Sequence, residues 1–277
     1  MDERGRPGLL SGLVAVVTGG GGGIGRGISE QFAAEDASVI VADIDAARAA
    51  ETRDAINAGG GRAVDVAVDV RTESGASAAV DAGVEAFGRL DILVNNVGHY
   101  GGPRRPFAEQ TEAEWDDLYR VNLAHVLLCS RAAIPHLVAA GGGSIVNIST
   151  VEAFRGIPGR PVYSAFKAAI TGFTRSLALD LGADAIRVNA IAPDVTETLQ
   201  VPYSTLVADD QRHLVPTWVP LGRFGEPSDI AGCAVFLASE LGRFVTGTTI
   251  HADGGTLAAG GWYPTEEGGW TNRPRRP

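Results

Sequence analysis

Short apolar segments rich in valine and isoleucine alternate with longer helix-like segments along most of this chain, and this alternation restricts the possible folds more than any other feature. The apolar segments read LVAVVTG, SVIVADI, AVDVAVDV, LDILVNN, GSIVNIS, IRVNAIAP and TGTTIHADGG. Parallel strands need crossover connections, which are nearly always right-handed, and they are buried on both faces of their sheet. The sequence therefore predicts an α/β fold, a doubly wound parallel sheet covered by helices.

The alternation runs to about residue 260 without a linker, a low-complexity block or a repeat of fixed period. With 277 residues, 45% of them apolar, the chain can bury a substantial core. We predict a single domain over residues 10–260, a flexible N-terminus over residues 1–9 and a C-terminal tail over residues 261–277. Two alternatives stay open for the tail: Trp262 and Trp270 either dock on a neighbouring subunit or belong to a disordered segment.

Charge and composition exclude several classes of partner. A net charge of −10 disfavours binding to nucleic acid or to anionic membranes, and the only basic cluster, Arg273 to Arg276, lies in the Pro-rich tail. Neither a leader sequence nor an apolar run long enough to cross a bilayer is apparent, so we expect a cytoplasmic protein. Cys129 and Cys233 lack the spacing of a metal site, which indicates buried free thiols and no bound metal.

Five consecutive glycines join the first apolar segment to a helix, in VAVVTGGGGGIGRGISEQFA. Glycines allow a tight turn and close approach of a ligand, and the N-terminus of the following helix offers free N–H groups to a pyrophosphate. Two registers are possible, because Gly20, Gly22 and Gly25 satisfy GxGxxG while Gly19, Gly23 and Gly25 satisfy GxxxGxG. This junction predicts a dinucleotide site.

Asp43 ends the next apolar segment, about 20 residues further on, where a carboxylate can bind the hydroxyls of an adenosine ribose. The 2′-phosphate of NADP beside this carboxylate would be repelled by about 4 kcal/mol per unit charge, at about 4 Å and an effective dielectric constant of about 20. Neighbouring residues such as Gly22 and Ile44 carry no compensating positive charge. We therefore predict NAD as the cofactor; the simpler alternative is that Asp43 only starts a turn.

The only lysine of the chain, Lys167, lies four residues after Tyr163 in the helix-like stretch VYSAFKAAITGFTRSLALDL. This spacing places both side chains on one helix face. A phenol with its ordinary pKa of about 10 is a poor base, and lowering that pKa to about 7 requires roughly 4 kcal/mol of preferential stabilisation of the phenolate. A nearby ammonium, together with the positive nicotinamide of NAD+, could supply this energy. The alternative is a solvated helix lysine.

Several motifs now occur together and in order: TGGGGGIG, NNVG at 95–98, Asn122 in YRVNL, NIST before YSAFK, NAIAPDVTET, and DGG at 253–255. This ordered set resembles the short-chain dehydrogenase/reductase family in its compact single-domain form, over roughly residues 10–258. The resemblance implies a Rossmann-type fold, an NAD(P)(H) cofactor and hydride transfer between nicotinamide and a carbonyl or hydroxyl carbon. It also implies assembly as a homotetramer.

The resemblance assigns catalytic roles by position. Tyr163 resembles the family's general acid/base, Lys167 the residue that lowers the tyrosine pKa and binds the nicotinamide ribose, and Asn122 the residue that holds a water in the proton relay. The family's substrate-polarising serine stands 13 residues before the tyrosine, where this chain has Thr150. Threonine keeps the hydroxyl but adds a methyl group, so we expect activity with a narrower substrate range. Ser149 is expected to hydrogen-bond to the backbone.

The same match implies a set of cofactor-binding residues near the ends of the strands. They are Gly19, Gly23, Ile24, Gly25, Asp43, Asp69, Val70, Asn95, Gly98, Tyr163, Lys167, Pro193, Thr196 and Thr198. Asp69, at the end of the third strand, resembles the adenine-contacting aspartate, and Asn95 the residue on the adenosine side. Asp194 replaces the usual glycine in NAIAPDVTET, which leaves the geometry of that turn open.

The substrate is expected beside the nicotinamide, at the carboxyl ends of the strands. The candidates are His99 and Tyr100 after NNVG, Glu152, and Tyr203 and Trp218 in the aperiodic segment 199–218, which resembles the family's substrate-covering loop. Tyr203 and Trp218 suggest an apolar wall, whereas Glu152 and His99 suggest a polar contact. Ordinary loop hydrogen bonding is the alternative for His99.

Together these patterns predict an NAD-dependent oxidoreductase that interconverts a secondary alcohol and a ketone. The alternative from another class is a non-catalytic NAD(H)-binding regulator or scaffold with the same fold, against which the intact Tyr163, Lys167 and Asn122 set argues. Among enzymes, the epimerase/dehydratase branch usually adds a sizeable C-terminal domain, for which the chain after residue 253 is too short. Enoyl reductases usually separate their tyrosine and lysine more widely.

Overall fold

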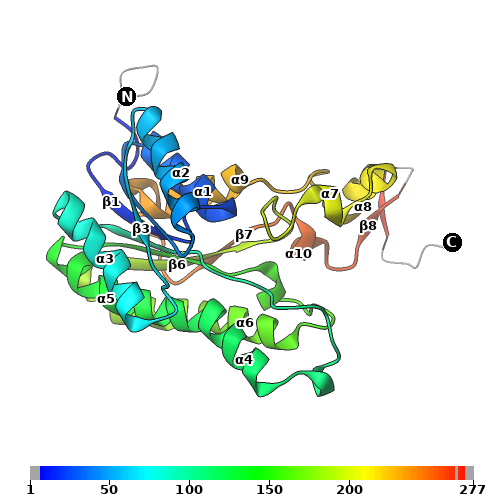
Figure 1. Ribbon diagram of the computed structural model, residues 1–277. Coiled ribbons are helices and arrows are strands. Elements are labelled where there is room, and N and C mark those ends of the chain that lie inside the picture. The colour runs from blue at the N-terminus through cyan, green and yellow to red at the C-terminus, as the bar shows by residue number, and fades with distance from the viewer. Residues whose placement is uncertain (1–6, 266–267, 272–277) are drawn as a thin grey trace.

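Seven parallel strands form the central sheet of the computed structural model, which describes residues 7–265 and 268–271 (Figure 1). The strand order is β3-β2-β1-β4-β5-β6-β7. The strands are β1 (Val14–Thr18), β2 (Ser38–Asp43), β3 (Arg62–Ala67), β4 (Ile92–Asn95), β5 (Gly143–Ile148), β6 (Ile186–Pro193) and β7 (Thr249–Ala252). Each lies in one of the seven apolar segments of the sequence, so the predicted doubly wound parallel sheet is confirmed.

Helices cover both faces of this sheet (Figure 1). One layer consists of α1 (Gly23–Ala34), α2 (Ala46–Ala58) and α9 (Pro227–Ala238), and the other of α3 (Glu73–Phe87), α5 (His125–Ala139) and α6 (Pro161–Asp180). Two hydrophobic clusters fill the two interfaces, and adjacent strand residues alternate between them: Val17 belongs to the α1/α9 cluster and Val16 to the α3/α5 cluster. Because both faces are buried there, the inner strands are mostly apolar, whereas the edge strands β3 and β7 are partly exposed and include Arg62, Asp65 and His251.

The strand order reverses beside β1, which lies between β2 and β4. The chain leaves β1 toward β2 on one side and later returns to β4 on the other. In open α/β sheets this reversal opens a crevice at the carboxyl ends of the strands, where ligands bind. The glycine turn after β1 is therefore placed at the predicted binding edge.

A long helical stretch, Glu112–Ala139, comprises α4 (Glu112–Tyr119), a π-helical turn (Arg120–Ala124) and α5. Its 28 residues include a window of mean hydropathy 1.3, long and apolar enough by composition to cross a membrane, which corrects the expectation that no such run exists. Its apolar character has a structural reason, since Cys129, Ala133 and Leu137 are buried in the cluster between α5 and the sheet.

The segment 199–218 contains α7 (Tyr203–Leu206), a 3₁₀ turn (Asp209–Leu214) and α8 (Val215–Trp218). Short elements, rather than an irregular loop, therefore explain its lack of periodicity. After α10 (Thr256–Ala259), β8 (Tyr263–Pro264) pairs antiparallel with β9 (Trp270–Thr271) near α8 (Figure 1). Docking of the tail on another subunit stays a prediction, and residues 266–267 and 272–277 lie outside the described part.

The N-terminal segment is attached to the domain before residue 10. The backbone N–H of Gly8 donates to Asp36 at 2.7 Å, and that of Leu9 donates to Glu35 at 2.9 Å. Residues 8 and 9, predicted as part of a flexible N-terminus, are therefore hydrogen-bonded to the end of α1, while residues 1–6 lie outside the described part.

Candidate active site

The structure selects one of the two glycine registers after β1. Gly19 and Gly23 adopt φ values of +63° and +51°, in the left-handed region that favours glycine, whereas Gly20 and Gly22 do not. A Cβ on Gly25 would lie 2.0 Å from the carbonyl oxygen of Gly19, so α1 can approach the turn only because Gly25 has no side chain. The GxxxGxG register at Gly19, Gly23 and Gly25 is therefore the structural one.

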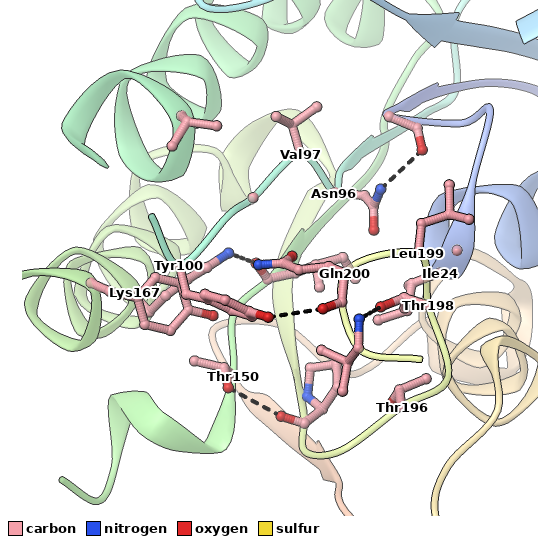
Figure 2. A pocket seen from close by; sticks show the side chains of 18 of the residues that line it. Ile24, Asn96, Val97, Tyr100, Thr150, Lys167, Thr196, Thr198, Leu199 and Gln200 are labelled. Carbon is pink, nitrogen blue, oxygen red and sulfur yellow. Dashed lines mark hydrogen bonds between the residues drawn. The ribbon is translucent and has the colours of Figure 1, made fainter. Parts of the chain in front are cut away.

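A cavity of about 670 Å³ opens at this edge of the sheet and extends from the glycine turn to the predicted catalytic residues (Figure 2). Most of the predicted residues line it: Gly19, Gly23, Ile24, Asp43, Asp69, Val70, Gly98, Thr150, Glu152, Tyr163, Lys167, Pro193, Thr196, Thr198 and Trp218. Helix α1 has no side-chain hydrogen bond at its N-cap, Gly22, so its first N–H groups can receive an anion. Bare glycine backbone, an open helix N-terminus and Asp43 together fit a dinucleotide.

Asp43 is held rigidly at the end of β2. Its carboxylate accepts hydrogen bonds from the backbone N–H of Gly21 and of Asp45, each at 3.0 Å. The expectation that no positive charge lies nearby is wrong, because Nη2 of Arg48, one turn into α2, lies 3.9 Å from Oδ1 of Asp43 and lines the cavity. Helix geometry returns Arg48 toward the strand end, which the local sequence around Asp43 does not reveal.

Asp69 lies two residues beyond β3 rather than at its last position. Both carboxylate oxygens of Asp69 accept hydrogen bonds from the Arg71 guanidinium at 2.8 Å. This hydrogen-bonded pair lowers the pKa of Asp69 below its ordinary value. Arg71 also lines the cavity, so a second arginine lies at this end.

The assignment of Asn95 to the cofactor site is wrong. Its side chain is fully buried and donates to Ser130 at 3.2 Å and to Asn147 at 2.9 Å, inside the domain. The next residue, Asn96, lines the cavity and donates to the carbonyl oxygens of Thr18 at 3.0 Å and of Gly19 at 3.3 Å. Side chains alternate along a strand, so a shift of one residue exchanges the core for the cavity.

Tyr163 and Lys167 lie in the first two turns of α6, which begins at Pro161. Nζ of Lys167 donates to the carbonyl oxygen of Ile148 at 3.0 Å and lies 6.0 Å from the centre of the Tyr163 ring. The lysine is only 3% exposed, which rules out the solvated alternative.

Burial shifts both pKa values in the protein without ligands. It lowers the pKa of Lys167 to about 8, because the charged ammonium is desolvated. It also raises the pKa of Tyr163 above its ordinary value, and a hydrogen bond with Thr150 offsets only part of that rise. Burial therefore dominates the Tyr163 pKa in the protein without ligands, and the lowering expected from Lys167 together with a positive nicotinamide stays a prediction.

Thr150 and Ser149 separate into two roles. Oγ1 of Thr150 faces the cavity and donates to the carbonyl oxygen of Pro193 at 3.3 Å (Figure 2). Oγ of Ser149 donates to the carbonyl oxygen of Lys167 at 3.0 Å, so the backbone role predicted for this serine is confirmed. Of the two hydroxyls, that of Thr150 interacts with Tyr163 and limits the rise of its pKa.

Asn122 lies in the π-helical turn and is fully buried. Its Oδ1 accepts from the backbone N–H of His99 at 3.1 Å, and its Nδ2 donates to the carbonyl oxygen of His99 at 2.9 Å. The side chain does not line the cavity but fixes the loop that follows β4. In the structure Asn122 therefore positions the backbone at His99, and its part in a water relay stays a prediction.

Asp194, which stands where the family usually has glycine, does not adopt a left-handed conformation. Its carboxylate instead accepts from Arg155 at 2.9 Å and from Thr256. Arg155 also donates to Glu152 at 3.0 Å, so one guanidinium joins two carboxylates at the cavity wall. The turn geometry that the sequence left open at Asp194 is therefore one in which the Asp194 carboxylate is ion-paired with Arg155.

Two of the five substrate candidates, His99 and Tyr203, do not line the cavity. His99 stacks on Tyr100, and its Nδ1 accepts from the backbone N–H of Gly101 at 2.9 Å, in accordance with the loop alternative. The hydroxyl of Tyr203 accepts from the Glu197 backbone at 2.8 Å, which turns this ring away. Tyr100 does line the cavity, as do Leu199 and Gln200 at the start of the predicted substrate-covering segment. The lining residues that the sequence analysis missed include Arg104, Ile157 and Arg160.

No group of three or more metal-ligating side chains occurs in the part of the chain that the structure describes.

His125, beneath the site, is fully buried, and desolvation, followed by the Lys167 charge, lowers its pKa to about 3. Burial likewise raises the pKa of the Cys129 thiol to about 12, so this cysteine is an inert apolar residue.

Comparison with known proteins gives full-length matches. A family model described as enoyl-(acyl carrier protein) reductase matches residues 19–256. The (2S)-[(R)-hydroxy(phenyl)methyl]succinyl-CoA dehydrogenase subunit BbsD of Thauera aromatica is 38% identical over 249 residues, 89% of this chain and 98% of that protein. The 2-dehydro-3-deoxy-D-gluconate 5-dehydrogenase of Escherichia coli K12 is 39% identical over 251 residues, covering 90% and 97% of the two chains.

A solved structure shares both fold and sequence with this chain. A 7α-hydroxysteroid dehydrogenase complexed with NADH and 7-oxo glycochenodeoxycholic acid superposes with a TM-score of 0.83 at 34% identity. The match covers 89% of this chain and 94% of that one.

Proposed function

The chain belongs to the short-chain dehydrogenase/reductase family of oxidoreductases, and we propose that it interconverts a secondary alcohol and a ketone with NAD(H) as the cofactor. The observation that carries this proposal is the convergence of Thr150, Tyr163 and Lys167 on one cavity whose other end is the bare glycine turn. A hydroxyl donor, a titratable phenol and a buried ammonium at one place can hold an alcohol oxygen and move its proton.

The residues would divide the work as follows. NAD+, when bound, supplies the hydride acceptor for the carbinol carbon. Tyr163 takes the hydroxyl proton of the alcohol in oxidation and returns it in reduction. Thr150 hydrogen-bonds the same oxygen, and Lys167, held by the Ile148 carbonyl, favours the phenolate through its charge. Lys167 can occupy this position because Gly98, beside it, lacks a side chain. A Cβ on Gly98 would lie 2.8 Å from Nζ of Lys167.

The NAD preference rests on Asp43, whose carboxylate would repel a 2′-phosphate. Arg48 and Arg71 lie at the same end of the cavity, but each is paired with a carboxylate, Arg48 with Asp45 at 3.1 Å and Arg71 with Asp69 at 2.8 Å. The positive charges are thus already balanced, and Asp43 keeps its discriminating effect. Equal affinity of the wild-type protein for NAD+ and NADP+ in a binding titration would contradict this assignment.

Asp43→Ser is expected to change cofactor preference. The ratio of kcat/KM for NADP+ to that for NAD+ should rise by about 100-fold, because removal of the carboxylate relieves a repulsion of a few kcal/mol. The ratio is the appropriate measure, since the same change removes hydrogen bonds to Gly21 and Asp45 and so weakens both activities. Asp54→Ser removes an exposed carboxylate of α2 that pairs with Arg53 and does not line the cavity, so it is the matched control and should leave the ratio within about twofold.

Thr150→Ala is expected to lower kcat by about 10² to 10³-fold, because it removes a donor to the reacting oxygen. Thr150→Ser keeps the hydroxyl and removes the methyl, so it should retain activity and accept bulkier alcohols. Steady-state rates for the three proteins on one set of alcohols measure both effects. If Thr150→Ala equalled the wild type, another group would have to polarise the substrate.

The competing interpretations have specific tests. A regulator or scaffold would bind NAD(H) and show no turnover on any alcohol or ketone. An enoyl reductase, the description attached to the matching family model, would reduce activated carbon–carbon double bonds; the i,i+4 spacing of Tyr163 and Lys167 and the dehydrogenase names of the full-length relatives argue against it. Assays with ketones and with enoyl thioesters separate the two activities.

We further propose a cytoplasmic homotetramer without nucleic-acid or membrane partners. The net charge of −10 and the burial of the apolar face of α5 support the last two points. Light scattering that gave a monomer would contradict the tetramer. The proposed activity is tested with NAD+, NADP+ and a panel of aliphatic, cyclic, polyol and steroid alcohols, by the absorbance of the reduced nicotinamide.

A further inference from the structure

Arg160 lies one helical turn before Tyr163, at the N-cap of α6, and borders the same cavity. Its Nη1 donates to the carbonyl oxygens of Tyr100 and, at 3.0 Å, of Gly102. Its guanidinium carbon lies 4.3 Å from the centre of the Tyr100 ring. Nε and Nη2 have no hydrogen-bond partner among residues 7–265 and 268–271, so one edge of the planar fork is unused.

Arg104 adds a second positive charge beside Arg160. Its aliphatic stem lies against Gly159, where a Cβ would be 3.2 Å from the Cβ of Arg104. Arg104 also lines the cavity, and within the described ranges it has no ion pair. Burial, with the nearby Arg104 charge, lowers the pKa of Arg160, as expected for two like charges without a counterion between them.

The other arginines of the cavity differ from this pair. Arg48, Arg71 and Arg155 each have a carboxylate partner, at 3.1, 2.8 and 2.9 Å respectively. Arg104 and Arg160 are thus the two lining arginines whose charge no described carboxylate balances. An uncompensated guanidinium pair with free donors, at the rim of a cavity, is the arrangement that recognises an anionic group.

We propose that Arg160 and Arg104 bind a carboxylate of the substrate, so that the protein acts on a secondary alcohol, or its ketone, that carries a carboxylate several bonds from the reacting carbon. This inference rests on the proposed function of the same cavity. The Nε and Nη2 edge of Arg160 matches the two oxygens of a carboxylate, and Arg104 supplies further attraction from the rim.

The aromatic contacts of Tyr100 indicate how far the proposed anion site at Arg160 lies from the phenol of Tyr163. The Tyr100 ring packs under the Arg160 guanidinium and meets the Tyr163 ring edge to face, with centroids 6.5 Å apart. The anion site and the phenol of Tyr163 are therefore separated by about one aromatic ring. A substrate that spans them would place its carbon skeleton over Tyr100, whose hydroxyl is held by the Gln200 carbonyl at 2.8 Å (Figure 2).

A purely structural role for Arg160, in which it only hydrogen-bonds the loop at Tyr100 to α6, makes a different prediction. Loss of these hydrogen bonds would lower the activity on every substrate alike, whereas loss of an anion site would lower the activity on charged substrates only. The test therefore uses cyclohexanols that bear a carboxylate on chains of increasing length, each paired with the primary amide of the same skeleton. For each pair the quantity measured is the ratio of kcat/KM for the acid to that for the amide.

For the best skeleton, the wild-type ratio should be about 10 to 100, in line with a charge-assisted hydrogen-bonded pair, and should fall as salt is added. Arg160→Gln should bring the ratio near unity, Arg160→Lys should retain part of it, and Arg104→Gln should lower it by about threefold. Arg131→Gln removes an equal charge from an arginine outside the cavity that is paired with Glu73, and should leave the ratio unchanged.

Two results would overturn the inference while leaving the proposed function intact. One is turnover of the neutral alcohols or amides with an acid-to-amide ratio near one for every skeleton. The other is an equal loss of acid and amide activity in Arg160→Gln, which would identify a structural tie only. No turnover of acids, amides or neutral alcohols with either cofactor would instead contradict the proposed function itself.

Discussion

Tyr163→Phe is expected to lower kcat/KM for alcohol oxidation by about 10³ to 10⁴-fold, because it removes the group that takes the hydroxyl proton. Phenylalanine keeps the ring that meets Tyr100 edge to face, so the cavity wall should stay in place. NAD+ affinity should therefore change by no more than about twofold. Steady-state rates and a cofactor titration on the same preparation measure the two quantities together.

Tyr119→Phe is the matched control for this variant. Tyr119 lies in α4, packs on Phe166 and does not line the cavity, so loss of its hydroxyl should leave kcat/KM unchanged. Retention of more than about a tenth of wild-type activity by Tyr163→Phe would show that another group, or a water, carries the proton.

Lys167→Met is the variant with the second largest expected effect. It removes the ammonium that favours the phenolate, and kcat should fall by about 10² to 10³-fold near neutral pH. Methionine has similar length and fills the buried position, so the fold should be retained. Part of the lost rate should return at higher pH, where Tyr163 ionises without help; a rate that stayed flat with pH would argue that Lys167 acts only by binding the cofactor.

The same lysine should also make stability depend on pH. Its pKa is about 8 in the folded protein, below the ordinary value of about 10.4 in an unfolded chain. Between these values the unfolded state binds more protons, so the free energy of unfolding rises with pH in this window. Relative to Lys167→Met, wild-type protein without cofactor should gain about 2 to 3 kcal/mol from pH 7 to pH 10.5, measured by urea unfolding. An unchanged difference would mean that the lysine is solvated.

The fold was predictable because the five inner strands are buried on both faces. Seven apolar segments rich in β-branched residues became seven parallel strands, whereas the order of those strands came from the structure. The glycine turn could be placed but not its register, because the positive φ values of Gly19 and Gly23 are not marked in a run of five glycines.

The candidate site was predictable where a role depends on local spacing. Tyr163 and Lys167 share a helix face, and both line the cavity. The prediction that Asn95 contacts the cofactor was wrong because neighbouring residues of a strand point to opposite sides, and the sequence did not distinguish Asn95 from Asn96.

Contacts between distant segments could not be read from local patterns. The pairing of Arg155 with Asp194, and the packing of Arg104 on Gly159, depend on tertiary structure. Arg160 did carry a usable signal, since it stands three residues before Tyr163 and therefore one helical turn from the phenol. Tyr203 was misplaced because an aromatic in a loop can pack on a neighbouring ring, here Phe224, as readily as on a ligand.

The measurement that tests the central claim most directly follows the hydrogen on the carbinol carbon. A secondary alcohol from the panel, deuterated at that carbon, is oxidised with NAD+, and the reduced cofactor is analysed by mass spectrometry. We predict that deuterium appears in the reduced nicotinamide in proportion to ketone formed, with wild type and not with Tyr163→Phe on the same timescale. Ketone formation without deuterium in the cofactor, or cofactor binding without turnover of any alcohol, would contradict the proposed oxidoreductase.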